Sequence, residues 1–188
     1  MEKKQNQITD FLTPERLKEL GVWQFGVVST DQIPFSEEAR KMCESNVCRN
    51  YGESWACPPA VGTVEECREK NLSYKDILVF SAFYPLEDSF DIEGMETAAN
   101  EFKNVCDRLY SELKKTDVEF QLLSNGKCSR CSKCTYPQEP CRFPERLFPA
   151  LEGCGVLVNK LAAKAGVKYI NGANTVTYLG GILYNRRR

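Results

Sequence analysis

A run of four closely spaced cysteines constrains this chain more than any other feature: Cys128, Cys131, Cys134 and Cys141. The first three are separated by gaps of two residues, and cysteines at this spacing can bind three corners of an iron–sulfur cube. A segment stiffened by Pro137 and Pro140 leads to the fourth, which can close the remaining corner. The run predicts a loop, the second cysteine loop (residues 127–144), that binds a cluster of the 4Fe–4S type.

A tetrathiolate zinc site is the alternative for the same cysteines, since such sites also use gaps of two residues. Zinc sites usually divide their cysteines into two pairs with a longer finger between them, whereas here three ligands follow in series. The spacing therefore favours a cluster over zinc, and a disulfide framework ranks third.

The chain contains no histidine. This absence excludes zinc sites that mix cysteine with histidine, Rieske clusters and histidine-ligated haem. It also excludes nucleophilic pairs in which a histidine activates a serine or a cysteine. Ligation by thiolates is the metal chemistry that remains.

Length and composition indicate one soluble globular domain over residues 1–188, with 42% hydrophobic and 27% charged residues. No apolar run is long enough to span a membrane, and residues 1–7 lack the apolar stretch of a secretory signal. We therefore expect a cytoplasmic protein, whose ten cysteines stay reduced and serve as metal ligands or buried residues. The formal net charge of −1 argues against nucleic-acid binding, and the Arg186–Arg188 tail is interpreted as solvated.

A first cysteine loop (residues 43–59) precedes the run and holds three cysteines: Cys43, Cys48 and Cys57. Their gaps are four and eight residues, and only the first gap resembles the spacing of plant-type ferredoxins. The Cys57-Pro58 pair resembles the end of a ferredoxin cysteine run, and an irregular loop has little apolar reason to keep three thiols. We interpret the loop as the site of a second cluster, with unrelated buried thiols as the alternative.

The fourth ligand of this cluster has three candidates: Cys67, Cys154 or no protein residue. A capping box of Thr63 and Glu66 begins a helix that places Cys67 one turn from its start, close in sequence to Cys57. Cys67 is therefore the preferred ligand, with a buried core position as its alternative. Cys154 lies between two glycines, and Cys106 on an apolar helical stripe is assigned to the core.

Strands and helices alternate along the chain, and this order predicts an α/β fold: a mixed, largely parallel sheet of about four to five strands flanked by helices, with two cysteine-rich cluster-binding loops. Gly26, inside the first strand, is expected where another element approaches closely. Strands are expected at residues 22–30, 76–84, 118–123, 168–170 and 175–184. Helices are expected at residues 14–20, 36–43, 92–113 and 156–165, and a further one begins at Thr63.

Basic residues surround the second cysteine loop: Lys127, Arg130, Lys133, Arg142 and Arg146. A tetrathiolate cluster is anionic, so nearby cations are expected to stabilise its reduced state and raise its reduction potential. A solvated basic surface is the alternative. The carboxylates of the two loops are too scattered to indicate an acid–base pair.

Several motifs of the chain occur together in one known group of proteins. They are Cys43, Cys48 and Tyr51-Gly52 with Cys57-Pro58-Pro59, the turn at Cys67, the run Cys128, Cys131 and Cys134 with Pro140-Cys141-Arg142-Phe143-Pro144, and Leu151-Glu152 before Gly155-Val156. In these the chain resembles the cysteine-rich prokaryotic family called domain of unknown function 2284, described as predicted metal-binding proteins. The resemblance spans most of the chain, and it implies metal binding without assigning a reaction.

The expected function is that of a cytoplasmic iron–sulfur protein with two 4Fe–4S-type clusters that passes single electrons to or from a redox partner protein. One rival is a zinc-stabilised interaction module, whose folding would depend on the metal. The other is an enzyme in which the first cluster has three protein thiolates and an open iron, which requires a substrate pocket. The predicted ligands are Cys43, Cys48, Cys57 and Cys67 for one cluster and Cys128, Cys131, Cys134 and Cys141 for the other.

Overall fold

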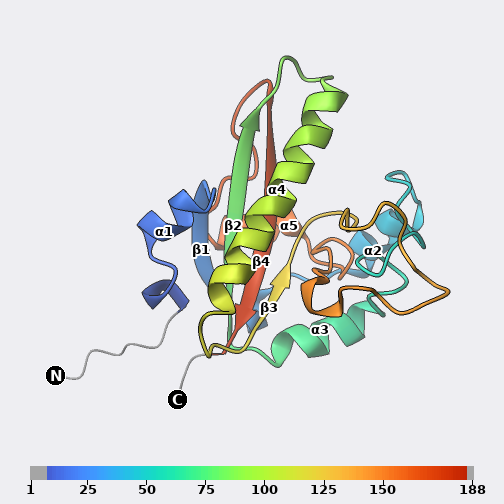
Figure 1. Ribbon diagram of the computed structural model, residues 1–188, viewed down its shortest axis with the longest axis horizontal. Helices are drawn as coiled ribbons and strands as arrows, with labels where there is room; N and C mark the ends of the chain where they lie inside the picture. Colours follow the sequence, from blue (N-terminus) through green and yellow to red (C-terminus); the bar gives the residue numbers. More distant parts are fainter. Residues whose placement is uncertain (1–7, 186–188) are drawn as a thin grey trace.

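A four-stranded antiparallel sheet forms the centre of the protein, in the strand order β1-β2-β4-β3. The computed structural model describes residues 8–185, so residues 1–7 and the Arg186–Arg188 tail lie outside the described part of the chain. Figure 1 shows β2 and β4 as the two long central strands. The strands are β1 (Gln24–Ser29), β2 (Asp76–Pro85), β3 (Phe120–Leu123) and β4 (Thr175–Tyr184).

The prediction of a largely parallel sheet was wrong, and the last strand explains why. Both β2 and β3 pair antiparallel with β4, so β2 and β3 themselves run in the same direction. The helix α4 (Ile92–Leu113) joins them as a crossover of the kind that connects parallel strands. Because β4 inserts between these two strands, no parallel pair forms, and the arrangement is a split β-α-β unit.

The edge strand β1 is antiparallel to β2 as well. Ser29 at the end of β1 pairs with Asp76 at the start of β2, so the long segment between them leaves and returns at the same end of the sheet. That segment carries α2 (Glu37–Glu44), the first cysteine loop and α3 (Val64–Leu72). The strand predicted at residues 168–170 is also wrong, because these residues form an exposed connection before β4.

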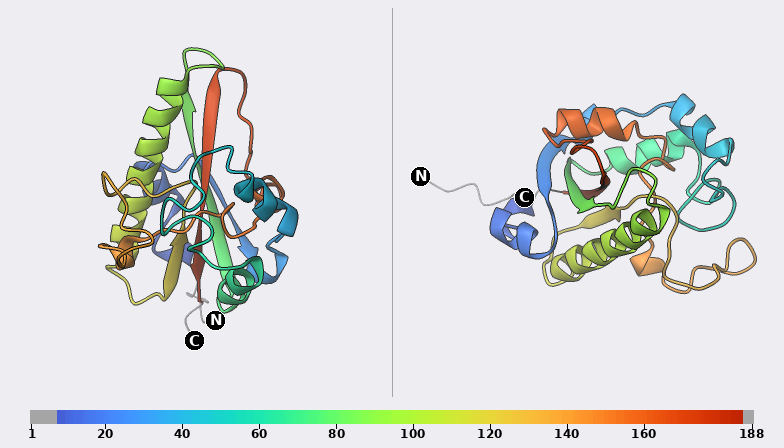
Figure 2. Two further views of the ribbon diagram at one scale, coloured as in Figure 1. Left: turned by 90° about the vertical axis from the view of Figure 1, so that its right-hand side faces the viewer. Right: turned by 90° about the horizontal axis from the view of Figure 1, so that it is seen from above.

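Helices cover both faces of the sheet, which gives the protein two apolar cores (Figure 2). On one face α4 packs against alternate residues of β2 and β4, with the rings of Phe80 and Phe102 stacked at 5.7 Å between centroids. The short helix α1 (Pro14–Glu19) adds Leu17 to this core. On the other face α3 and α5 (Val158–Lys164) pack against the opposite side chains of the same strands.

The local signals for helix starts were confirmed. The N–H of Glu66 donates to the Thr63 hydroxyl at 3.1 Å, and the N–H of Thr63 donates to the Glu66 carboxylate at 2.7 Å, so the capping box of α3 is complete. Thr13 caps α1 and Ser36 caps α2 in the expected way. Short 3-10 turns complete the fold at Ile8–Asp10, Thr30–Gln32 and Pro144–Arg146.

The short length of β3 leaves half of β4 open. β3 pairs only with Gly181–Tyr184, so the stretch from Thr175 to Gly180 has no β3 residue beside it. Beyond Leu123 the chain leaves the sheet and becomes the second cysteine loop. Both cysteine loops lie on the same side of the molecule, to the right of the sheet in Figure 1.

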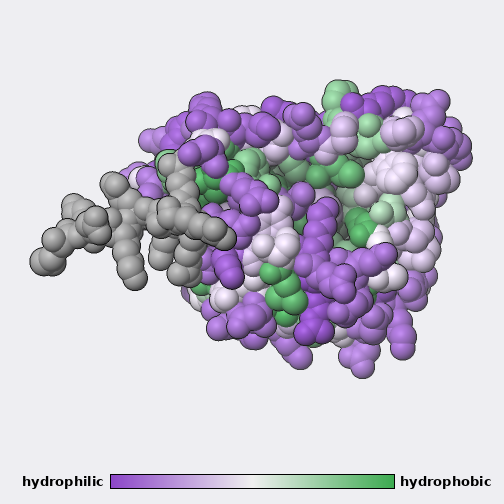
Figure 3. All heavy atoms as spheres, turned by 90° about the horizontal axis from the view of Figure 1, so that it is seen from below, coloured by the Kyte–Doolittle hydropathy of each residue, from purple (hydrophilic) through white to green (hydrophobic). Residues whose placement is uncertain are grey.

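The surface is largely hydrophilic at the end of the sheet where β4 finishes. Hydrophobic atoms show there in small separate patches (Figure 3). Within residues 8–185, no helix combines the length and the apolar character that crossing a lipid bilayer requires.

We predict that Gly26→Ala lowers the free energy of unfolding by about 2–4 kcal/mol. A methyl group on Gly26 would overlap with the backbone carbonyl oxygen of Ala165 at the end of α5, and backbone cannot move aside as a flexible side chain can. The measurement is urea unfolding followed by circular dichroism. Val27→Ala is the matched control, since Val27 is the next residue of β1 and is 39% exposed; equal losses in the two variants would contradict the close approach.

Candidate metal centres

The second cysteine loop brings its four cysteines to one small hollow. Trp55, Arg142 and Arg146 line the same hollow. Each of the four cysteines is partly exposed, so this hollow lies at the surface of the loop. The structure therefore gathers the complete predicted set of Cys128, Cys131, Cys134 and Cys141.

Ion pairs to α4 hold this loop against the protein. The carboxylate of Asp107 accepts from Arg130 at 2.5 Å and from Arg146 at 3.2 Å. The guanidinium groups also lie over aromatic rings, Arg130 over Phe148 and Arg146 over Tyr110. Two of the five basic residues around the loop are thus structural anchors whose charge is partly compensated by Asp107.

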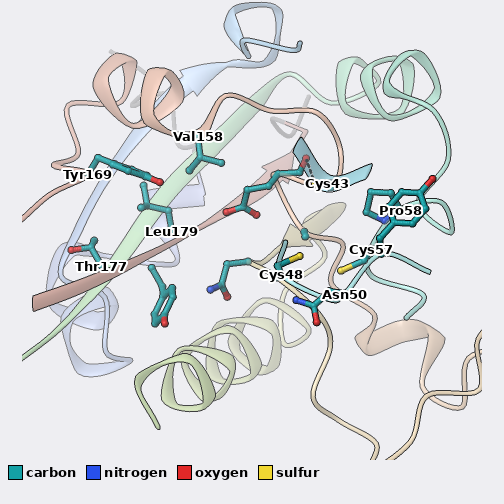
Figure 4. Close-up of a pocket in the computed structure, with 16 residues that line it drawn as sticks. Cys43, Cys48, Asn50, Cys57, Pro58, Val158, Tyr169, Thr177 and Leu179 are labelled. Carbon is teal, nitrogen blue, oxygen red and sulfur yellow. Dashed lines mark hydrogen bonds between the residues drawn. The ribbon is translucent and has the colours of Figure 1, made fainter. Parts of the chain in front are cut away.

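The first cysteine loop places its three thiols on a cavity of about 340 Å³. Cys43 lies near the end of α2, Cys48 follows in the loop, and Cys57 is buried at its far end. Figure 4 shows Cys48 and Cys57 on one side of the cavity and Tyr169, opposite them, on the other. The predicted trio of the first loop is therefore also brought together.

Backbone hydrogen bonds shape the first cysteine loop. The N–H of Gly52 donates to the carbonyl of Pro58 at 2.8 Å, and the N–H of Tyr51 donates to the Asn46 side chain at 3.0 Å. Gly52 has a positive φ of 73°, a conformation that glycine adopts without steric cost. These bonds fold the chain back so that Cys57 approaches the end of α2.

Burial changes the pKa of two thiols of this loop. It raises the pKa of Cys57 to about 11, and burial also raises the pKa of Cys43. Metals bind thiolates, so a metal at this site must displace the protons that burial favours. Proton release on metal loading follows from that competition.

Trp55 joins the two loops. Its indole N–H lies 3.3 Å from the Thr135 hydroxyl and 3.2 Å from the Glu139 carbonyl, and its ring meets Tyr136 edge-on at 5.0 Å. Next to it, the N–H of Ala150 donates to the carbonyl of Ala56 at 2.9 Å. The two candidate centres therefore form one connected structure.

Lys103 of α4 is a functional candidate that the sequence analysis missed. Its ammonium group donates to the Ser124 hydroxyl at 3.1 Å and to Asn125, at the point where β3 becomes the second cysteine loop. Burial lowers its pKa, and the negative charges of Cys57 and Cys128 oppose that shift. The Lys103 ammonium thus interacts electrostatically with one thiol from each loop. The sequence pattern of the helix gave no sign that this residue lies near the cysteine loops.

Glu152 is the second residue that was missed. Its side chain lines the cavity of the first loop and stays accessible to solvent there, although protein surrounds it closely enough that burial raises its pKa. The N–H of Gly126 supports the carboxylate. The Glu152 carbonyl lies 3.8 Å from the sulfur of Cys43. Its place in the Leu151-Glu152 motif was the only sequence signal.

Cys67 and Cys154 do not line the cavity. Cys67, on α3, and Cys154, before α5, are both buried in the core on that face of the sheet, where they hydrogen-bond to each other. That bond lowers the pKa of Cys67 and raises the pKa of Cys154, and the buried Arg40 guanidinium also favours the Cys67 thiolate. Cys67 as the fourth ligand stays a prediction. Cys106 lies in the core, with its sulfur 3.4 Å from the Ser124 hydroxyl.

The kind of donor fits the predicted chemistry, since thiolates hold iron–sulfur clusters, and four thiols line one hollow and three line one cavity. Across residues 8–185, no three cysteine, aspartate or glutamate side chains are arranged to hold a metal ion as they stand. A family model described as a predicted metal-binding protein, DUF2284, matches residues 26–184. Neither the curated proteins nor the solved structures gave a match to the chain.

We predict that Asp107→Ala lowers the free energy of unfolding by about 1–3 kcal/mol, because it leaves Arg130 and Arg146 side by side without their shared carboxylate. Urea unfolding of the purified protein measures the change. Glu101→Ala is the matched control on the same helix, since its pair with Arg108 is more exposed and costs below about 1 kcal/mol. A larger loss in the control would show that Asp107 does not anchor the loop.

Proposed function

Since the chain belongs to the predicted metal-binding family called domain of unknown function 2284, we propose that it is an iron–sulfur protein with one 4Fe–4S-type cluster at each cysteine loop. The observation that carries this proposal is the gathering of Cys128, Cys131, Cys134 and Cys141 around one hollow. Three ligands in series suit a cube better than a tetrahedral ion. A zinc site in the same loop remains the alternative.

The proposed role is the transfer of single electrons between a partner protein and the interior of this protein. Clusters of this type supply one-electron chemistry when bound. The thiols of the second loop are partly exposed, which suits exchange with a partner, whereas Cys57 in the first loop is buried. Trp55 and Lys103 lie between the loops, and the Lys103 ammonium stabilises negative charge on either side.

The cavity favours a second candidate function, an enzyme that works at the first loop. Three thiols and a cavity of about 340 Å³ occur together there, and this volume lies in the range of small-molecule sites. Neither Cys67 nor Cys154 reaches the cavity lining, so three thiolates would leave one iron open toward it. Electrons would then enter through the second loop and be used at the first.

We predict that anaerobically purified protein is brown and contains iron with an equal amount of acid-labile sulfide. The measurements are elemental analysis for iron and zinc, sulfide analysis, and electron paramagnetic resonance before and after reduction. Two clusters should give two distinguishable signals in the reduced protein. Zinc in stoichiometric amount without sulfide would instead support the zinc module.

We predict that serine replacements of Cys43, Cys48 or Cys57 remove or alter one paramagnetic signal, while replacements of Cys131 or Cys134 affect the other. Each change removes a ligand from one site only. Cys106→Ala is the control, since Cys106 is fully buried in the core and lines neither the cavity of the first loop nor the hollow of the second.

The same series decides the fourth ligand of the first cluster. If Cys67→Ser leaves iron content and both signals unchanged, Cys67 is not a ligand, and the open-iron enzyme becomes the better description. Loss of the first signal in Cys67→Ser would instead confirm it as the fourth ligand.

A further inference from the structure

The cavity beside the first cysteine loop has a definite electrostatic character. It lies along the part of β4 that β3 leaves unpaired, and Thr177 and Leu179 of that strand line it (Figure 4). Among its lining residues there is no lysine or arginine. Glu152 is the one carboxylate among them.

Lys103, the cation whose charge acts on Glu152, hydrogen-bonds to other partners. The Lys103 ammonium donates to Ser124 and Asn125 and lines the neighbouring hollow on the α4 side, not this cavity. No cationic side chain of the lining would pair with an anionic ligand, although the Lys103 charge also acts on the Glu152 carboxylate from behind the cavity wall. A carboxylate or phosphate placed here would meet the Glu152 carboxylate with no lysine or arginine of the lining beside it.

The remaining lining suits a ligand with an apolar body and a positive end. Val158 and Leu179 supply apolar surface at the end away from the thiols, next to Tyr169. Tyr51 and Tyr178 line other parts of the wall, and aromatic rings attract organic cations. The carboxylate of Glu152 can accept charge-assisted hydrogen bonds from an ammonium group.

We propose that this cavity binds a small organic amine in its ammonium form, with Glu152 as the residue that recognises the positive charge. The inference rests on the proposed function, because it makes the cavity the substrate site of the first cluster. The substrate class is then a primary amine attached to a small apolar or aromatic body. Glu152 acts as a binding residue, and its role requires no proton transfer.

Three probes of similar size and different charge test the inference: benzylamine, benzyl alcohol and benzoate. Each is titrated into the purified, metal-loaded protein by isothermal titration calorimetry. Benzylamine should bind at least about tenfold more tightly than benzyl alcohol, and benzoate should not bind at millimolar concentration. Equal affinities, tighter binding of benzoate, or no binding of benzylamine would each overturn the proposal.

The substitution Glu152→Gln removes the negative charge of this side chain and keeps its size. It should remove the preference for benzylamine, about tenfold in affinity, and leave the affinity for benzyl alcohol unchanged. Glu87→Gln is the control, since Glu87 is exposed in the connection between β2 and α4 and does not line the cavity. An equal loss of benzylamine binding in both variants would refute a specific role for Glu152.

Spectroscopy separates this inference from the proposed function. Benzylamine should perturb the paramagnetic signal assigned to the first loop and not that of the second. If Glu152→Gln alters that signal before any amine is added, the carboxylate is a metal ligand and the amine proposal fails. If the protein holds no iron yet still prefers benzylamine through Glu152, the cavity assignment stands and the iron–sulfur proposal fails.

Discussion

The antiparallel pairing of β2 with β4 is the constraint on which the rest of the structure depends. It joins ten residue pairs, from Asp76–Tyr184 to Pro85–Thr175, and both apolar cores are built on the two faces of these strands. The position of β4 between β2 and β3 decides what lies at its open edge.

The cavity of the first cysteine loop lies along that open edge of β4. A longer β3 would pair with the stretch from Thr175 to Gly180 and fill the place where the cavity lies. Instead the chain leaves the sheet after Leu123, and the first cysteine loop approaches from the other side. Thr177 and Leu179 of this half-paired strand thus line one side of the cavity, and Cys48 and Cys57 lie across from them.

The two candidate centres differ in the charge of the residues around them. The second loop is surrounded by cations, two of which Asp107 ties to α4, whereas the lining of the first-loop cavity holds a carboxylate and no cation. Lys103 stands between them, within reach of thiols from both loops. Such an arrangement suits an electron entry site at the second loop and binding of a positively charged molecule at the first.

The sequence by itself determined what is local. Cysteine spacing pointed to both cysteine loops, since the cysteines that each loop gathers lie close in sequence. Capping residues and apolar periodicity located the main helices and four of the five expected strands. The close approach at Gly26 was also readable, because glycine in a strand marks crowding. Only the tertiary structure decided the sheet: the position of β4 between β2 and β3 depends on side-chain packing across the whole chain, and it turned an expected parallel sheet into an antiparallel one. The same long-range packing brought Glu152 and Lys103 to the cysteine loops. It also placed Cys67 next to Cys154. No local sequence pattern encodes contacts between residues so far apart in sequence.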